Sequence, residues 1–273
     1  MSARNAAPAS DLTLRAVPAI KEIDAAAWNA CANPTVSAVQ AVQPNSEECS
    51  MSGESASEIP SNPFISYEFL SSLEDSSSAV ARTGWQPQHL LAEATDGTIA
   101  GVVPCYLKSH SRGEYVFDRG WAEAYERAGG SYYPKLQVSV PFTPATGRRL
   151  LVRPSPDAER IREGLTAGLI ELCRMHHASS VHLTFLPESE STLLAEHKFL
   201  HRTDQQFHWE NGGYPTFDAF LEALSARKRK TIRRERRDAL APGITVEWLT
   251  GSDLTEAVWD AFFQFYMETG SRK

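Results

Sequence analysis

The chain has 273 residues, of which 42% are hydrophobic and 22% are charged, and its formal net charge is -7. This length and apolar content suffice for one large domain or for two smaller domains with hydrophobic cores. The acidic balance argues against a protein that binds nucleic acid or membranes over its whole surface. Four scattered cysteines without CxxC spacing indicate neither a zinc knuckle nor a disulfide framework.

The N-terminal sequence lacks the continuous apolar segment of a signal peptide, and no apolar run is long enough to cross a bilayer. We therefore expect no transmembrane segment and a cytoplasmic location. Alternation over Leu12–Val17 predicts a strand, and a short helix is expected from Ile20 to about Ala32. Residues 33–61 are rich in Ser, Ala, Glu and Pro and lack aromatic residues, which predicts a disordered insertion.

Folded structure is expected to resume at Asn62, after the predicted disordered insertion. Ser66 is a suitable N-cap for the next helix. Two apolar stretches, His89–Ala94 and Ile99–Leu107, are predicted strands of a hairpin that turns at Asp96-Gly97.

Residues 106–151 contain the densest set of reactive side chains in the chain. Between His110 and Pro134 neither a period of 2 nor one of 3.6 fits, which predicts a long ordered loop with a functional role. A surface loop packed on its own aromatic side chains is the alternative. The acid and base candidates of this stretch are Lys108, His110, Glu114, Tyr115 and Asp118.

A strand interrupted at Pro144–Gly147 is expected next, formed by Tyr133–Phe142 and Arg148–Val152 and followed by a helix from Asp157 to about His177. In acyltransferases a splayed strand exposes N–H groups to the amides of an acyl donor, and a helix N-terminus offers donors to its pyrophosphate. A simple bulged turn is the competing interpretation.

The remaining elements of the first part are a strand over Ser180–Leu186, a helix over Glu188–His197 and a strand over Leu200–Trp209. Together, these elements predict an α/β fold with a mixed sheet flanked by helices. No HxxxH or HExxH spacing occurs, so we expect no metal site.

The C-terminal part begins with a predicted helix from Thr216 through Leu240, which Pro242-Gly243 ends. A strand over Ile244–Leu249 and a final helix capped by Ser252 or Asp253 are expected to follow.

Eight of the 27 basic residues lie in the eleven positions from Arg227 to Arg237 and place positive charge on nearly every face of the predicted helix. They predict a polyanion site for a phosphate-bearing donor, RNA or an anionic lipid headgroup. A solvated linker helix that pairs with the acidic remainder is the alternative. The predicted polyanion contacts are Arg227, Arg229, Lys230, Arg233, Arg234 and Arg237.

Several short motifs resemble the FemAB-like, DUF482 group of bacterial N-acyltransferases within the GNAT superfamily, from about residue 62 to the end. They are NPF (62–64), GWQP (84–87), YLKSHS (106–111), GEYVFD (113–118), YYPKL (132–136), PFTP (141–144), QFHW (206–209) and KRKTIRRER (228–236). The resemblance implies a GNAT-like domain over residues 1–215 and the start of a second GNAT-like unit, cut short, over residues 216–273.

The resemblance also implies that the chain transfers an acyl or aminoacyl group to an amine of a small molecule or a peptidoglycan precursor. Acyl-CoA or aminoacyl-tRNA is the expected donor, with no permanently bound cofactor, and tRNA is a candidate partner of the basic helix. We expect His110 and Glu114 to act as base or to contact substrate. A non-catalytic RNA- or lipid-binding module is the second hypothesis, and the oligomeric state stays open.

Two further sets of residues complete the predicted site. The expected substrate contacts are Lys108, Tyr115, Asp118, Tyr133 and Lys135. The expected contacts to the acyl donor are Phe142, Thr143, Thr146 and Gly147.

Overall fold

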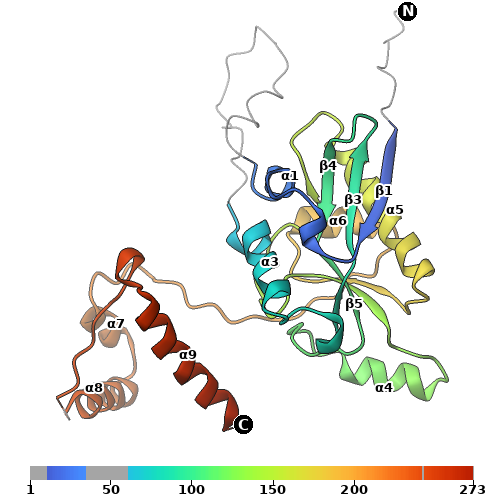
Figure 1. Ribbon diagram of the computed structural model, residues 1–273. Coiled ribbons are helices and arrows are strands. Elements are labelled where there is room, and N and C mark those ends of the chain that lie inside the picture. Colours follow the sequence, from blue (N-terminus) through green and yellow to red (C-terminus); the bar gives the residue numbers. More distant parts are fainter. Residues whose placement is uncertain (1–10, 35–60, 242, 273) are drawn as a thin grey trace, which may run out of the picture. The chain divides into compact units, whose positions relative to one another are not determined.

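The computed structural model describes residues 11–34, 61–241 and 243–272 (Figure 1). The chain divides into two compact units, Met1–Thr203 and Asp204–Lys273. This division lies near the predicted boundary at residue 215, and the assignment of the two parts as GNAT-like units stays a prediction. Most of the predicted disordered insertion, residues 35–60, lies outside the described residues.

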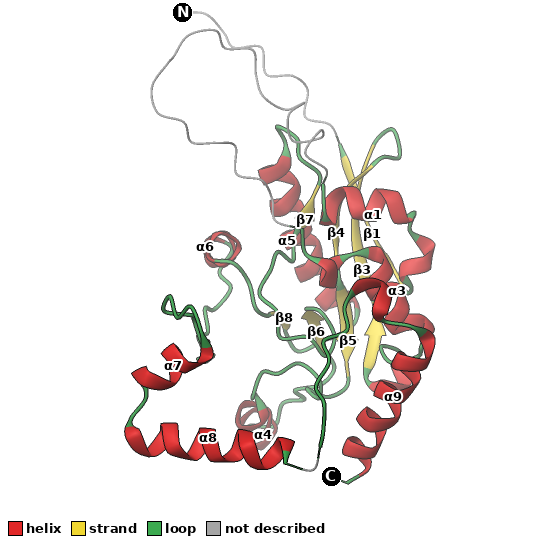
Figure 2. Cartoon of the chain, turned by 90° about the vertical axis from the view of Figure 1, so that its left-hand side faces the viewer, coloured by secondary structure: helices red, strands yellow, loops and turns green. Residues whose placement is uncertain are grey.

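The first unit contains two four-stranded sheets (Figure 2). The first sheet has the order β1 (Leu12–Val17), β3 (His89–Ala94), β4 (Ile99–Val103) and β7 (Leu151–Val152), and its strands are antiparallel. The second sheet has the order β2 (Trp85–Pro87), β5 (Cys105–Lys108), β6 (Lys135–Val138) and β8 (Val181–Leu183), with β6 and β8 parallel.

Two bent stretches of the chain run from one sheet into the other. Only Gln88 separates β2 from β3, and only Pro104 separates β4 from β5. The N–H of Gln88 still donates to the carbonyl oxygen of Cys105 at 2.8 Å, so the pairing continues across the bend, whereas Pro104 has no N–H to donate. The predicted hairpin at Asp96-Gly97 is confirmed, with Gly97 at a φ of 81°.

Helices cover both faces of the first sheet (Figure 1). Successive residues of a strand point to opposite faces, so Leu90 packs toward α5 while Leu91 packs toward α1 and α3. The helices of this unit are α1 (Ala25–Ala32), α3 (Tyr67–Asp75), α4 (Arg119–Arg127), α5 (Ala158–Met175) and α6 (Glu188–Glu196). The predicted fold class, a mixed α/β sheet flanked by helices, is confirmed.

Local sequence signals account for several of these elements. The hydroxyl of Ser66 accepts a hydrogen bond from the N–H of Phe69, which confirms the predicted N-cap of α3. The apolar stripe of α5 is buried at Ile161, Leu165 and Leu169, as its spacing predicts. No described helix is long and apolar enough to span a membrane.

The segment between His110 and Pro134 is not a continuous loop as predicted, because it contains α4. This helix buries only Ala122, and the rings of Trp121 and Tyr125 on the same side are exposed. The interrupted strand is also shorter than predicted, with β6 ending at Val138 and β7 beginning at Leu151.

The second unit consists of helices and extended segments. Its helices are α7 (Phe217–Ala223), α8 (Ala226–Leu240) and α9 (Glu256–Ser271). The single helix predicted for residues 216–240 is therefore broken, because Leu224 adopts an extended ψ of 157°. The strands predicted for Leu200–Trp209 and Ile244–Leu249 are wrong, since neither segment pairs with a neighbouring strand among the described residues.

Candidate functional site

A buried cluster of four charged side chains lies at the end of the second sheet. Lys108 at the end of β5 and Lys135 at the start of β6 are direct partners across the antiparallel pair. Two positive charges in this position repel each other unless acidic groups compensate them. Glu114 and Asp118, from the segment between the two strands, supply that compensation, and all four side chains are buried.

Lys135 is the centre of the cluster. Its Nζ lies 2.8 Å from Oε2 of Glu114 and 2.6 Å from Oδ2 of Asp118, and it donates to Oγ of Ser111 at 2.9 Å. These three acceptors match the three hydrogens of an ammonium group. A fully paired lysine in this position favours the ionised form of both carboxylates.

Lys108 has weaker partners. Its Nζ lies 3.4 Å from the centroid of a Trp85 ring, donates to the carbonyl oxygen of Arg112 at 3.3 Å, and lies 3.9 Å from Oε1 of Glu114. Burial lowers the pKa of Lys108 to about 7, although the charge of Glu114 opposes this shift. Burial also raises the pKa of Glu114, whose Oε1 accepts no hydrogen bond from the described residues.

The low pKa of Lys108 predicts a dependence of stability on pH. The folded chain releases this proton near pH 7, whereas the unfolded chain holds it up to the ordinary value of 10.5. The unfolded state therefore binds more protons between about pH 7 and 10.5, and the free energy of unfolding should rise with pH in this window. Urea denaturation of the unmodified chain and of Lys108→Met at several pH values measures the effect. A difference between the two proteins that stays constant across the window would contradict the prediction.

Hydroxyl groups surround the acidic side of the cluster. Burial alone would raise the pKa of Asp118, but hydrogen bonds from Lys135, Ser111 and Tyr132 hold the pKa below its ordinary value. The hydroxyls of Ser111 and Tyr133 lie 2.8 Å apart and extend the network. Asp118 therefore remains a carboxylate at neutral pH.

His182 is part of the same surroundings and comes from β8. Burial and the positive charge of Lys135 lower the pKa of His182 to about 4, so its imidazole is neutral at physiological pH. Its Nε2 lies 2.9 Å from Oγ of Ser180. Neither this histidine nor Ser111, Trp85 or Tyr132 was among the predicted site residues.

The cross-strand register would have indicated two of the missed residues, Trp85 and His182. Once Lys108 is aligned with Lys135, the pairing of β2 on β5 places Trp85 opposite Lys108. The parallel pairing of β8 on β6 likewise places His182 opposite Gln137. Such an alignment is not visible in a single sequence without the strand order.

The structure brings together most of the predicted catalytic residues and substrate contacts. Lys108, Glu114, Asp118 and Lys135 form the cluster, and Tyr133 joins it through Ser111. The other two residues lie outside the cluster. His110 accepts a hydrogen bond from the N–H of Arg112 at 3.2 Å, and Tyr115 is exposed at a φ of 55°. Burial lowers the pKa of His110, which favours its neutral, basic form.

The predicted donor contacts lie in the segment between β6 and β7. The N–H groups of Phe142, Thr143 and Gly147 donate to Gly113, Val140 and Phe185, respectively. Arg149 is buried and donates to the carbonyl oxygens of Ala145, Gly147 and Arg148, which fixes the shape of the segment. A role of this segment in binding an acyl donor stays a prediction, since three of its four predicted residues already use their N–H groups within the chain.

Close packing of Gly113 on Phe142 connects this segment to the charged cluster. A Cβ atom at Gly113 would lie 2.6 Å from the Phe142 ring, and Gly113 has a φ of 81°. We expect Gly113→Ala to lower the free energy of unfolding by about 2–4 kcal/mol, from the left-handed backbone and from overpacking. Gly97→Ala is the matched control, because Gly97 has the same φ but open space around it. Equal losses in chemical denaturation would show that the packing contributes nothing.

A second candidate site lies on α8. Five of the six predicted polyanion contacts line a hollow of about 350 Å³ together with Ala226, and the sixth, Arg227, does not line it. We call these five cations, which all lie on one side of α8, the basic face. They are Arg229, Lys230, Arg233, Arg234 and Arg237.

The part of the chain that the structure describes contains no group of three or more His, Cys, Asp or Glu side chains able to hold a metal ion.

Comparisons with known proteins identify the family of the chain. The sequence model of the FemAB-like family, described as peptidoglycan biosynthesis/recognition, matches residues 19–273. A search of curated protein sequences found no significant match. Among solved structures, the chain is similar to a crystal structure of an acetyltransferase from Trypanosoma brucei, with 14% identity and a TM-score of 0.35, over 73% of this chain and 99% of that one. Because the family match spans nearly the whole sequence, the chain belongs to the FemAB-like family.

Proposed function

We propose that this chain transfers an acyl or aminoacyl group to an amine in peptidoglycan metabolism. Membership of the FemAB-like family supports this class of reaction. The observation that carries the proposal is the buried cluster, in which Glu114 combines a raised pKa with an oxygen that accepts no hydrogen bond from the described residues. Nothing in the family match favours a non-catalytic RNA- or lipid-binding module.

The reaction requires a base for the attacking amine. The nitrogen lone pair forms a bond to the carbonyl carbon of the donor, and the bond from that carbon to the donor's sulfur or oxygen breaks. The proton lost by nitrogen passes to the base and then to the departing sulfur or oxygen. A carboxylate with a raised pKa is a stronger base than an exposed one, which suits Glu114, and neutral His110 is the second candidate.

The remaining assignments follow from this proposal. Acyl-CoA and aminoacyl-tRNA are the two donor classes to compare, and a free amine of a small molecule or of a peptidoglycan precursor is the acceptor. We assign substrate binding to Tyr133, Lys108 and Lys135, which lie around Glu114, and contact with the donor to the segment from Phe142 to Gly147. A cytoplasmic location stays a prediction.

An assay of the purified chain tests the proposal directly. Acetyl-CoA and aminoacyl-tRNA are each supplied with peptidoglycan precursor peptides. The products are separated, and their masses are measured by mass spectrometry. We expect a product whose mass increases by one acyl or aminoacyl group with one of the two donors. Absence of turnover with every donor, for a chain that is folded by circular dichroism, would overturn the proposal.

A further inference from the structure

The basic face of α8 is a surface that the proposed reaction does not use. We propose that this face binds an anionic lipid surface and holds the second unit on a membrane. The inference is independent of acyl transfer, because it concerns binding and no chemical step.

The geometry of the helix gathers the five cations. At 3.6 residues per turn, positions 229, 230, 233, 234 and 237 fall within an arc of about 140° around α8. The hollow of about 350 Å³ between their side chains is lined by these five residues and Ala226 alone. No acidic residue of α8 falls within this arc, and such a concentration of positive charge attracts a surface of repeated negative charge.

Most of this charge is uncompensated. Arg233 lies 3.7 Å from Asp218, and Arg237 lies 2.9 Å from Asp238. In the part of the chain that the structure describes, no ion pair involves Arg229, Lys230 or Arg234. These three cations are therefore available to a partner without the loss of an existing contact.

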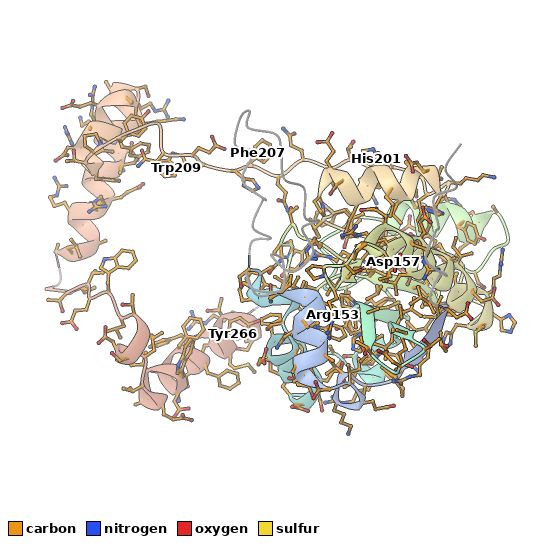
Figure 3. All side chains as sticks on the ribbon, turned by 90° about the horizontal axis from the view of Figure 1, so that it is seen from above. Arg153, Asp157, His201, Phe207, Trp209 and Tyr266 are labelled. Atoms are coloured by element: carbon orange, nitrogen blue, oxygen red, sulfur yellow. The ribbon has the colours of Figure 1, made fainter. Side chains whose placement is uncertain are left out.

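Exposed aromatic rings lie beside the basic face. Trp209 and Phe217 both contact the ring of Phe220, with centroids 5.8 Å apart in each pair. This group joins α8 through Arg236, whose guanidinium lies 4.2 Å from the centroid of Phe217. Trp209 is 68% exposed and Phe217 is 43% exposed, and Figure 3 marks Trp209 on the extended segment before α7.

Aromatic rings next to cations are typical of proteins that lie at the interface between lipid headgroups and acyl chains. Single-stranded RNA is a poorer match for the same surface. Proteins that bind such RNA interleave stacking rings with the cations of the groove, and the basic face itself contains only cations and Ala226. The observations therefore favour a lipid surface, and RNA is an outcome of the test.

The test uses sedimentation of the full chain with two kinds of vesicle, phosphatidylcholine alone and phosphatidylcholine with phosphatidylglycerol. We expect binding to the anionic vesicles only, and we expect added salt to weaken it. Arg229→Glu/Lys230→Glu/Arg234→Glu should weaken binding by on the order of 100-fold or more, since each cation near an anionic surface contributes. These substitutions break no ion pair of the described chain, so the fold should persist, as circular dichroism will show.

A matched variant controls for net charge. Lys21→Glu/Arg82→Glu/Lys198→Glu changes the charge by the same amount at three exposed cations of the first unit and should bind as the unmodified chain does. Equal binding of the unmodified chain to both vesicle types would overturn the proposal, even if the α8 variant failed to fold. Unchanged binding of a folded α8 variant would also overturn the proposal. A third contrary result is that polyuridylate displaces the chain from anionic vesicles at a lower concentration than competing phosphatidylglycerol vesicles do. That result would assign the basic face to RNA.

Discussion

Replacing Lys135 by methionine is expected to lower the free energy of unfolding by about 3–5 kcal/mol. The substitution keeps most of the side-chain volume but leaves Glu114 and Asp118 buried without their shared cation. Two carboxylates confined in this way repel each other and lose the hydrogen bonds that Nζ donates. Equilibrium denaturation in urea, followed by circular dichroism, measures the loss.

Two further variants test the cause of that loss. Lys21→Met changes the same residue type at an exposed position and should alter stability by less than about 0.5 kcal/mol. Adding Glu114→Gln and Asp118→Asn to Lys135→Met removes the unpaired charges and should recover part of the lost stability. If the triple variant is no more stable than Lys135→Met, the loss comes from packing and not from charge.

Glu114→Gln is expected to reduce the rate of acyl transfer by about 10²–10⁴-fold, the usual contribution of a positioned base. Glutamine has the shape of glutamate but cannot accept a proton from an amine. The fold should survive the change, because Lys135 retains its contacts with Asp118 and Ser111. Steady-state kinetics with the donor and acceptor found by the transfer assay measure the loss in kcat.

The exposed Glu126 on α4 provides the control for this substitution. Glu126→Gln changes the same chemical group outside the cluster and should leave kcat unchanged. A rate for Glu114→Gln within a few-fold of the unmodified enzyme would exclude Glu114 as the base. In that case His110→Gln tests the second candidate in the same assay.

The sequence predicted the fold of the first unit well because its signals are local. The alternation of Leu12–Val17, the turn at Asp96-Gly97 and the stripe of α5 each occupy one short segment. Strands that depend on a distant partner were harder to predict. Leu200–Trp209 and Ile244–Leu249 have strand-like sequences, yet no described strand lies beside them, and their backbone stays outside any ladder.

Only part of the candidate site could be predicted from the sequence, because the rest depends on contacts between distant segments. Reactive side chains concentrated in one stretch indicated Lys108, Glu114, Asp118 and Lys135, and the structure places them in one cluster. Their roles as buried partners depend on distances between strands, which residue types alone do not give. His182 was missed because it reaches the cluster from a strand that is more than 40 positions further along the chain.

The pairing of Lys108 with Lys135 also determines how β5 and β6 align during folding. Side chains alternate between the two sides of a strand, so a slip of one residue would turn Lys135 to the opposite side of the sheet. Glu114 and Asp118 would then be buried without their shared cation, at a cost of several kcal/mol. Misaligned pairings of β5 and β6 are therefore strongly disfavoured. The charged cluster thus specifies the strand register in addition to forming a candidate catalytic site.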